Sequence, residues 1–396
     1  MKILVVGACP YPAGLGSQVY LGATTNALLS MGYQVRVAVY GWGETGEGTG
    51  RAVALAPCPG VISGHGTPDL VAPLLRASTW GRIPKRVTSG PNRRKLLDDV
   101  ALWQLLRRLR KTDPPDVVCA HNHESLVVSL MAGFSRVVYF AHNALSEELP
   151  WYATDDRLRR LAEVIGHGVD SLLPRRASLV IVPHHRLAGH LVLRGCPQDK
   201  IRILPPPAEP LLLEAPLLSR ERVEPCPAVV YFGNLDAYQN TGMLLRAMTR
   251  ARESRPNMRL IVVSRDPAVI PGAEMVQDRG LETLADMLAR DVIVAIPRAG
   301  WSGYPIKLVN ALSAGKPIVT TTSAAWELEN NVHALVVDER DDRAFAEALV
   351  RLVDHEELRL RLGRQARVLA LERHHPEQYA ASLDALIRDT FVTTAN

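Results

Sequence analysis

The chain has 396 residues, of which 47% are hydrophobic and 22% charged, and its formal net charge is +5. This length exceeds one typical core, so two domains of similar size are expected, and the composition is that of a soluble globular protein. The chain has five cysteines, Cys9, Cys58, Cys119, Cys196 and Cys226, which lie far apart with no C-x-x-C pair. This spacing argues against a disulfide framework and a structural zinc site, and it fits a reducing cytoplasm.

The chain runs from Met1 and Lys2 directly into the apolar segment Ile3–Val6. No apolar run reaches the roughly 20 residues that a membrane-spanning helix needs. We therefore expect neither secretion nor a membrane span, and a cytoplasmic location.

Short apolar strands alternate with helical segments, which predicts an α/β fold of parallel sheets covered by helices on both faces. In the first half the predicted strands are 3–6, 35–40, 117–120, 137–141, 179–182 and 201–204. In the second half they are 228–232, 259–263, 292–296, 318–321 and 334–337. The proline-rich segment 205–210 reads as a linker, so the predicted units are 1–204 and 211–375, followed by a helical segment, 376–396.

Basic residues concentrate between Arg82 and Lys111, where ten lysines and arginines are opposed only by Asp98 and Asp99. The segment 95–109 is predicted to be a helix with a leucine stripe flanked by arginines. One interpretation is a helix packed on the first sheet with a solvated basic face. The other is a peripheral contact with anionic lipid on the inner face of a membrane. Nucleic-acid binding is not expected, because aromatic residues are not interleaved with the basic ones.

A glycine-containing loop follows the first strand and opens the helix that begins near Gln18. Gly14 and Gly16 in this loop offer backbone N–H groups to a phosphate. A dinucleotide fingerprint would need a third glycine where Val19 stands, and an acidic residue after the second strand, which instead ends at Tyr40. A dehydrogenase is therefore disfavoured.

Histidines follow several strands of the first half. His142 follows strand 137–141 at its carboxyl end, where open α/β sheets bind ligands, and can be either a site residue or a helix cap. His121 and His123 follow strand 117–120 and could line an acceptor side. No H-x-x-x-H arrangement with a carboxylate is present, so no metal site is expected. His184, after a further strand, is predicted to be a cleft-wall or helix-entry residue.

In the second half, polar and basic residues also follow strands. The turn after strand 228–232 carries Gly233, Asn234 and Gln239. Arg265 and Arg298 follow the next two strands, at ends that should face a cleft.

The segment Trp301–Thr320 contains a turn, a short helix and a strand. The turn is predicted to be formed by Ser302, Gly303, Tyr304 and Pro305. Ile306 would start the helix, whose free N–H groups suit an anion. Lys307 would add charge for a phosphate, and Asn310, three residues later on the same face, could bond a sugar hydroxyl. An ordinary loop and helix of an α/β domain is the alternative.

This segment resembles the donor-binding segment of GT-B glycosyltransferases, most closely the retaining enzymes of family 4. The resemblance implies two Rossmann-like domains facing a cleft, with an acceptor site in residues 1–204, a donor site in 211–375, and a last helix, 376–396, that crosses back to the first domain. It also implies a nucleotide-diphosphate sugar as donor, UDP- or GDP-linked, no cofactor and no metal. The sugar-containing acceptor would be a glycan, a lipid-linked molecule or a small molecule. Closure about the linker 205–210 would bring the substrates together.

The same resemblance implies roles for residues of the first half. It places Gly14 and Gly16 near the sugar and phosphates, and His142 against the transferred sugar. Glu147 and Glu148 resemble the acidic residues that often accompany this histidine.

The chain departs from the family pattern at four positions. Ser302 and Asn310 stand where two glutamates are usual, and Asn234 and Gln239 where an arginine and a lysine bind the diphosphate. Positive charge must then come from Lys307, Arg265 or Arg298.

These departures keep other interpretations open. An inverting enzyme could use Glu147 or Glu148 as its base. The chain could also be a nucleotide-sugar epimerase, or a non-catalytic protein that binds a nucleotide or a sugar.

Overall fold

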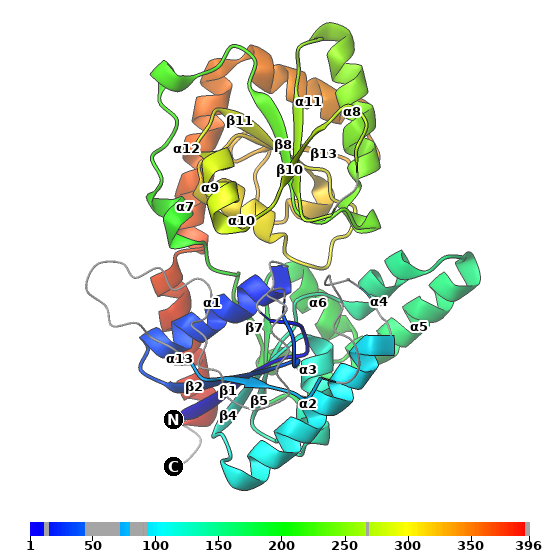
Figure 1. Ribbon diagram of the computed structural model, residues 1–396, viewed down its shortest axis with the longest axis vertical. Coiled ribbons are helices and arrows are strands. Elements are labelled where there is room, and N and C mark those ends of the chain that lie inside the picture. The colour runs from blue at the N-terminus through cyan, green and yellow to red at the C-terminus, as the bar shows by residue number, and fades with distance from the viewer. Residues whose placement is uncertain (12–15, 44–71, 80–89, 91–92, 267–268, 393–396) are drawn as a thin grey trace. The chain divides into compact units, whose positions relative to one another are not determined.

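The computed structural model describes residues 1–11, 16–43, 72–79, 90, 93–266 and 269–392. The chain divides into two compact units (Figure 1). The first comprises Met1–Pro206 together with Glu377–Asn396, and the second Pro207–Pro376. The division of the chain thus lies inside the proline-rich segment.

The first unit is built on a seven-stranded parallel sheet with the order β3-β2-β1-β4-β5-β6-β7. Its strands are β1 (Lys2–Gly7), β2 (Gln34–Val39), β3 (Leu74–Arg76), β4 (Val117–His121), β5 (Val137–Phe140), β6 (Leu179–Val182) and β7 (Ile201–Ile203). Every residue of β4, β5 and β6 is buried, as expected for a parallel sheet covered by helices on both faces.

The helices of this unit lie between its strands in sequence, except the last one, which follows the whole second unit. They are α1 (Gly16–Ser30), α2 (Arg93–Thr112), α3 (Asn122–Met131), α4 (Leu145–Glu148), α5 (Asp156–Leu172), α6 (His185–Leu193) and α13 (Pro376–Phe391). Short 3₁₀ helices are η1 (Leu149–Tyr152), η2 (Pro174–Arg176) and η3 (Gln198–Lys200).

Helix α13 packs into the core of the first unit, although the whole second unit separates it from that core in sequence. Tyr379, Leu383 and Ile387 are buried in the same apolar cluster as residues of β1 and β2. The hydroxyls of Tyr379 and Thr24 lie 2.8 Å apart, within hydrogen-bond distance.

The second unit is built on a six-stranded parallel sheet with the order β10-β9-β8-β11-β12-β13. Its strands are β8 (Ala228–Phe232), β9 (Leu260–Ser264), β10 (Glu274–Gln277), β11 (Val292–Ile296), β12 (Ile318–Thr321) and β13 (Leu335–Val337). Its helices are α7 (Pro210–Glu214), α8 (Thr241–Ser254), α9 (Leu281–Leu288), α10 (Ile306–Ser313), α11 (Asp342–Asp354) and α12 (Glu356–Arg373), with 3₁₀ helices η4 (Arg220–Arg222), η5 (Ala237–Gln239) and η6 (Thr322–Ala324).

The two sheets confirm the predicted pair of doubly wound, Rossmann-like domains. β3 and β10 were not predicted, because both are short edge strands with partly exposed residues. No helix in the described part of the chain is long and apolar enough to cross a membrane.

Each sheet reverses its direction of winding at one point. In the first unit this point lies between β1 and β4, and in the second between β8 and β11. Ligands of open α/β sheets bind outside the carboxyl ends of the strands at such a point. The fold therefore directs attention to the loops after these four strands.

Candidate functional site

Lys307 lies at the switch point of the second unit, on the first turn of α10. Its Nζ is 3.0 Å from the Tyr231 hydroxyl and 3.0 Å from Oε1 of Gln239. It also lies over the Tyr231 ring, 4.1 Å from the centroid. The strand β8 supplies this tyrosine, so the structure brings together the loops that follow the two central strands.

Gln239 contacts this lysine, and Asn234 in turn contacts Gln239. Gln239 Nε2 donates to Asn234 Oδ1 at 2.7 Å, which leaves Oε1 of the same amide to accept from Lys307. Asn234 also donates to the Tyr238 hydroxyl at 3.2 Å, and its backbone carbonyl accepts from the hydroxyl of Tyr231. The two amides thus position the lysine.

Arg298 is the second basic side chain of this region, and it is buried. It follows β11, donates to the carbonyl of Gly300 at 2.6 Å, and lies over the Tyr238 ring, 5.1 Å from its centroid. Burial, and then the charge of Arg298, hold the pKa of Lys307 well below its ordinary value, against the opposing charge of Asp236. A buried arginine beside a lysine whose pKa is lowered forms a site suited to an anion, because a bound anion favours the charged form of both.

Gly233 gives the lysine the room that it needs. Its φ is +122°, a region that residues with a side chain rarely adopt, and an added Cβ would lie 3.0 Å from Lys307 Nζ. Glycine is therefore favoured at this position for two reasons: its backbone conformation and the lack of room for a side chain beside Lys307.

We predict that Gly233→Ala lowers the free energy of unfolding by about 1–3 kcal/mol through backbone strain. Denaturant unfolding measures this effect. Gly242→Ala is the matched control, since its nearest neighbour would be 3.6 Å away in α8, and it should leave the free energy of unfolding unchanged or slightly raise it. Equal behaviour of the two variants would contradict the role of Gly233.

The predicted turn before α10 has the expected bounds, and Ile306 starts the helix. Pro305 stands at the N-cap with an extended backbone, and no side chain of the described residues caps the helix. Ser302 is buried. Gly303 lies in the same turn, and Asn310 lies on α10 one turn after Lys307.

Two predicted residues of this region have other partners. Tyr304 lies with its hydroxyl 3.2 Å from both Glu327 and His374, in a polar cluster of its own. Arg265, after β9, donates to the carboxylate of Asp278 at 3.1 Å.

In the first unit His142 is paired with His121. Nε2 of His142 lies 2.9 Å from Nδ1 of His121, and Tyr20 packs against the His142 ring with centroids 4.9 Å apart. Burial, and then the charge of His123, lower the pKa of His142 to about 3. Both paired imidazoles are therefore neutral near pH 7, and one ring nitrogen of the pair must donate while the other accepts.

Glu148 belongs to a half-buried cluster of charged and polar side chains. It accepts hydrogen bonds from Asn143 and from the Tyr152 hydroxyl, and burial raises its pKa. Glu147 lies next to it on α4.

Glu124 joins this cluster from the start of α3 and was not predicted from the sequence. It pairs with Lys95 of α2 and, at 3.3 Å, with His123. Burial alone would raise the pKa of Glu124, but these two cations hold it below its ordinary range. The position of Glu124 three residues after His121, itself at a strand end, was the available signal.

The remaining predictions of the first unit concern glycines and one histidine. Gly14 lies outside the described residues, and Gly16 is the exposed first residue of α1. His184 caps α6 by accepting from the N–H of Leu187 at 3.2 Å, which confirms the helix-entry interpretation. Among the residues that the structure describes, no group of three or more His, Cys, Asp or Glu could hold a metal ion.

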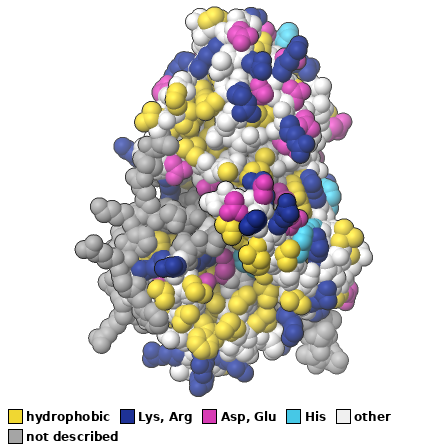
Figure 2. Space-filling model, turned by 90° about the vertical axis from the view of Figure 1, so that its right-hand side faces the viewer, with side chains coloured by type: hydrophobic (Ala, Val, Ile, Leu, Met, Phe, Trp, Pro, Cys, Tyr) yellow, Lys and Arg dark blue, Asp and Glu magenta, His cyan; other side chains and the backbone are white. Residues whose placement is uncertain are grey.

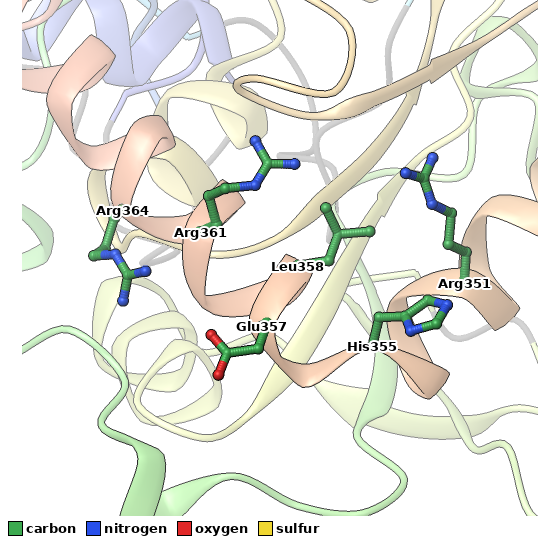
Figure 3. Close-up of a pocket in the computed structure, with 6 residues that line it drawn as sticks. All are labelled: Arg351, His355, Glu357, Leu358, Arg361 and Arg364. Carbon is green, nitrogen blue, oxygen red and sulfur yellow. The ribbon is translucent and has the colours of Figure 1, made fainter.

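A surface hollow of about 410 Å³ lies in the second unit, where α11 ends and α12 begins. It is lined by Arg351, His355, Glu357, Leu358, Arg361 and Arg364. Figure 3 shows that these side chains diverge, with the guanidinium of Arg364 and the carboxylate of Glu357 directed away from Arg351. Arg361 donates to the carbonyl of Asn331 at 2.8 Å, and Glu357 pairs with Arg220. We assign no ligand to this hollow.

Comparison with known proteins agrees with this fold. Residues 15–210 match the family described as Glycosyltransferase Family 4, and residues 226–355 match Glycosyl transferases group 1. A search of the curated proteins found no match.

Solved structures share the fold at low identity. A sucrose-phosphate synthase from Thermosynechococcus elongatus has a TM-score of 0.77 at 15% identity, covering 99% of this chain and 100% of that one. Anabaena HepE in complex with UDP and glucose has a TM-score of 0.71 at 15% identity, covering 98% and 100%. WaaG, a glycosyltransferase involved in lipopolysaccharide biosynthesis, has a TM-score of 0.68 at 17% identity, covering 96% and 99%.

The fold and the matches together define the class of this protein, a GT-B glycosyltransferase. Within that class the chain resembles family 4, from which it differs at the positions of the glutamate pair.

Proposed function

We propose that this enzyme transfers a sugar from a nucleotide-diphosphate sugar to a sugar-containing acceptor, with the donor bound by the second unit and the acceptor by the first. The observation that carries the proposal is the pair of basic side chains, half-buried Lys307 and buried Arg298, at the switch point of the second sheet. Negative charge grows on the β-phosphate as the sugar departs, and preorganised cations stabilise it. Lys307 takes this role, with Arg298 beside it.

A UDP-sugar is the proposed donor. Among the structures of the same fold, HepE is found with UDP-glucose and a trehalose-6-phosphate protein with UDP-2-fluoro glucose. In this chain Ser302 and Asn310 would contact the ribose, since both flank the start of α10, where the anion would lie. Asparagine offers a neutral amide for a ribose hydroxyl where a glutamate would offer a carboxylate.

His142 would contact the transferred sugar. Its imidazole is neutral, so it can exchange a hydrogen bond with a sugar hydroxyl without placing a cation next to the developing oxocarbenium centre. His121 positions the ring through the 2.9 Å contact between the two imidazoles.

Retention of configuration and independence of divalent metal are part of the proposal. The two cations would supply the charge that a metal otherwise brings to a diphosphate. In a retaining reaction the leaving phosphate accepts the acceptor proton. Glu148, whose pKa is raised by burial, is the candidate base for the inverting alternative.

The cysteines support a reducing compartment, and we propose a cytoplasmic location. Cys9, Cys119 and Cys196 are buried and unpaired. Burial raises the pKa of Cys9 and of Cys119 to about 12, so these thiols are protonated and unreactive near neutral pH.

A thermal-shift screen against UDP, GDP, ADP, CMP and their sugar conjugates tests the donor assignment, because a ligand that binds only the native state raises its stability. We expect a shift with UDP and its conjugates. Turnover of the selected donor is then followed by NMR with a panel of sugar acceptors, with and without EDTA. A glycosylated product with the donor's anomeric configuration supports the proposal. Epimerised sugar without acceptor, or tight binding with no turnover, identifies the two alternative functions.

We predict that His142→Ala lowers kcat/KM about tenfold, the worth of one hydrogen bond in the transition state. The affinity for UDP alone should not change, since the proposed contact is with the sugar. His184→Ala, which removes a helix cap, is the control and should lower thermal stability while leaving kcat/KM as it is. Weaker UDP binding by His142→Ala would contradict a contact with the sugar and indicate a contact with the nucleotide.

A further inference from the structure

Helix α5 has its apolar side turned outward. Its sequence, DRLRRLAEVIGHGVDSL, places Leu158, Leu161, Ile165 and Leu172 along one stripe. In a globular protein such a stripe normally faces the core. Here these four side chains are 47%, 54%, 50% and 64% exposed.

The opposite side of α5 is the one that packs on the protein. An added Cβ on Gly166 would lie 2.3 Å from the backbone of Ser146, so the two helices approach closely there. Asp170, also buried, accepts from the N–H groups of Leu145 and Ser146 at 2.9 and 3.1 Å. Since small and polar residues attach the helix to α4, the outward direction of the stripe is fixed by specific contacts.

Helix α5 is firmly formed at its first turn. Asp155 caps it by accepting from the N–H groups of Arg157 and Leu158, each at 2.9 Å. Arg157, Arg159 and Arg160 follow, all exposed, and within the described residues none of their side chains forms an ion pair. The stripe therefore has three arginines beside it, together with the exposed carboxylates of Asp155, Asp156 and Glu163. The excess of positive charge comes from α2 rather than from α5.

Helix α2 repeats the combination. The sequence predicted either packing or lipid contact for its leucine stripe. In the structure Leu102 and Leu106 are buried in the unit, whereas Leu96, Leu97 and Val100 are exposed. The outward face also carries Arg93, Arg107, Arg108 and Lys111.

The net positive charge of the protein lies in the unit that carries these helices. Met1–Pro206 with Glu377–Asn396 contains 25 Lys and Arg against 18 Asp and Glu, a net +7, whereas Pro207–Pro376 contains 21 against 23, a net −2. Both helices lie on the right of the first unit in Figure 1, the side that Figure 2 views, and there apolar side chains gather with lysines and arginines beside them.

We propose that α5, together with the outward face of α2, docks the enzyme on a bilayer that carries anionic lipid headgroups. Aliphatic side chains on a projecting helix can enter the acyl boundary, while long arginine side chains beside them reach the headgroup phosphates. This proposal goes beyond the proposed glycosyl transfer and does not depend on it.

Vesicle co-sedimentation of the full chain tests the docking. With phosphatidylcholine vesicles containing 30% phosphatidylglycerol we expect binding that weakens as salt is added, and little binding to phosphatidylcholine alone. Leu161→Gln/Ile165→Gln should lower the partition coefficient at least tenfold. Val368→Gln/Leu371→Gln is the matched control, because these side chains are 46% and 42% exposed on α12 of the other unit, and it should bind as the unaltered chain does.

Three results would overturn the proposal. They are no binding to the anionic vesicles, equal binding by the α5 double variant, and a stable dimer by light scattering that this variant dissolves, which would assign the stripe to a second copy. UDP titration of the same variants separates this outcome from a failure of the proposed function, because affinity for UDP should be the same in all of them.

Discussion

Lys307→Met should lower kcat by about 10²- to 10³-fold, the usual effect of removing a preorganised group that stabilises transition-state charge, and should not destabilise the fold. The ammonium is desolvated and repelled by Arg298, so its removal relieves an unfavourable charge, which offsets the two hydrogen bonds lost to Tyr231 and Gln239. Methionine keeps the length of the side chain over the Tyr231 ring. Turnover of the UDP-sugar and the melting temperature are measured together.

Lys316→Met is the matched control for that variant. Lys316 is a buried lysine near α10 whose Nζ donates to the carbonyl of Arg290 at 2.7 Å, and burial lowers its pKa to about 8. Its loss should leave the backbone carbonyl unpaired, lower the melting temperature and keep kcat within about twofold, because ordinary changes remote from reacting atoms affect stability more than chemistry. Near-normal turnover by Lys307→Met would end the role assigned to this lysine.

Donor binding should take up a proton. In the unliganded protein burial and Arg298 hold the pKa of Lys307 well below the ordinary value, and a bound diphosphate should raise it. Between these two pKa values the lysine is neutral in the free protein and charged in the complex. Affinity for UDP must therefore fall as the pH rises through this window, by up to about tenfold per pH unit. Below the lower pKa the lysine is charged in both states, so its contribution to affinity no longer changes with pH.

Calorimetric titration with UDP above about pH 8 measures this coupling, because the terminal phosphate, whose second pKa is about 6, is then ionised. Two buffers with different ionisation enthalpies give the number of protons taken up. The unaltered chain should take up close to one proton within the window. Lys307→Met should take up none, and an equal uptake by both proteins would assign the proton to another group.

The strand pattern was predictable because most strands are buried on both faces, which leaves continuous apolar runs in the sequence. β3 and β10 lack this signal, since edge strands of three or four residues are partly exposed on one side. That Gly233 and Lys307 come close together was also predictable, because both follow central strands; the donor site at this place stays a proposal.

The partners that set the chemistry of Lys307 were harder to predict. Tyr231 lies inside a buried strand, where its sequence context indicates only a core residue, yet its hydroxyl and ring both contact the lysine. Lys95 reaches Glu124 from another helix, across 29 positions of the sequence. Such contacts depend on how two elements pack, and no local pattern encodes them.

Because of the placement of α13, the first unit is the first to be synthesised but not the first to have its complete core. The ribosome makes the strands of the first sheet first, but Tyr379, Leu383 and Phe391 of their core emerge only after the whole second unit. Until then the groove that these side chains fill stays open to water, whereas the second unit contains all of its own core in one continuous stretch. The domain that begins the chain is therefore the last to finish folding during translation.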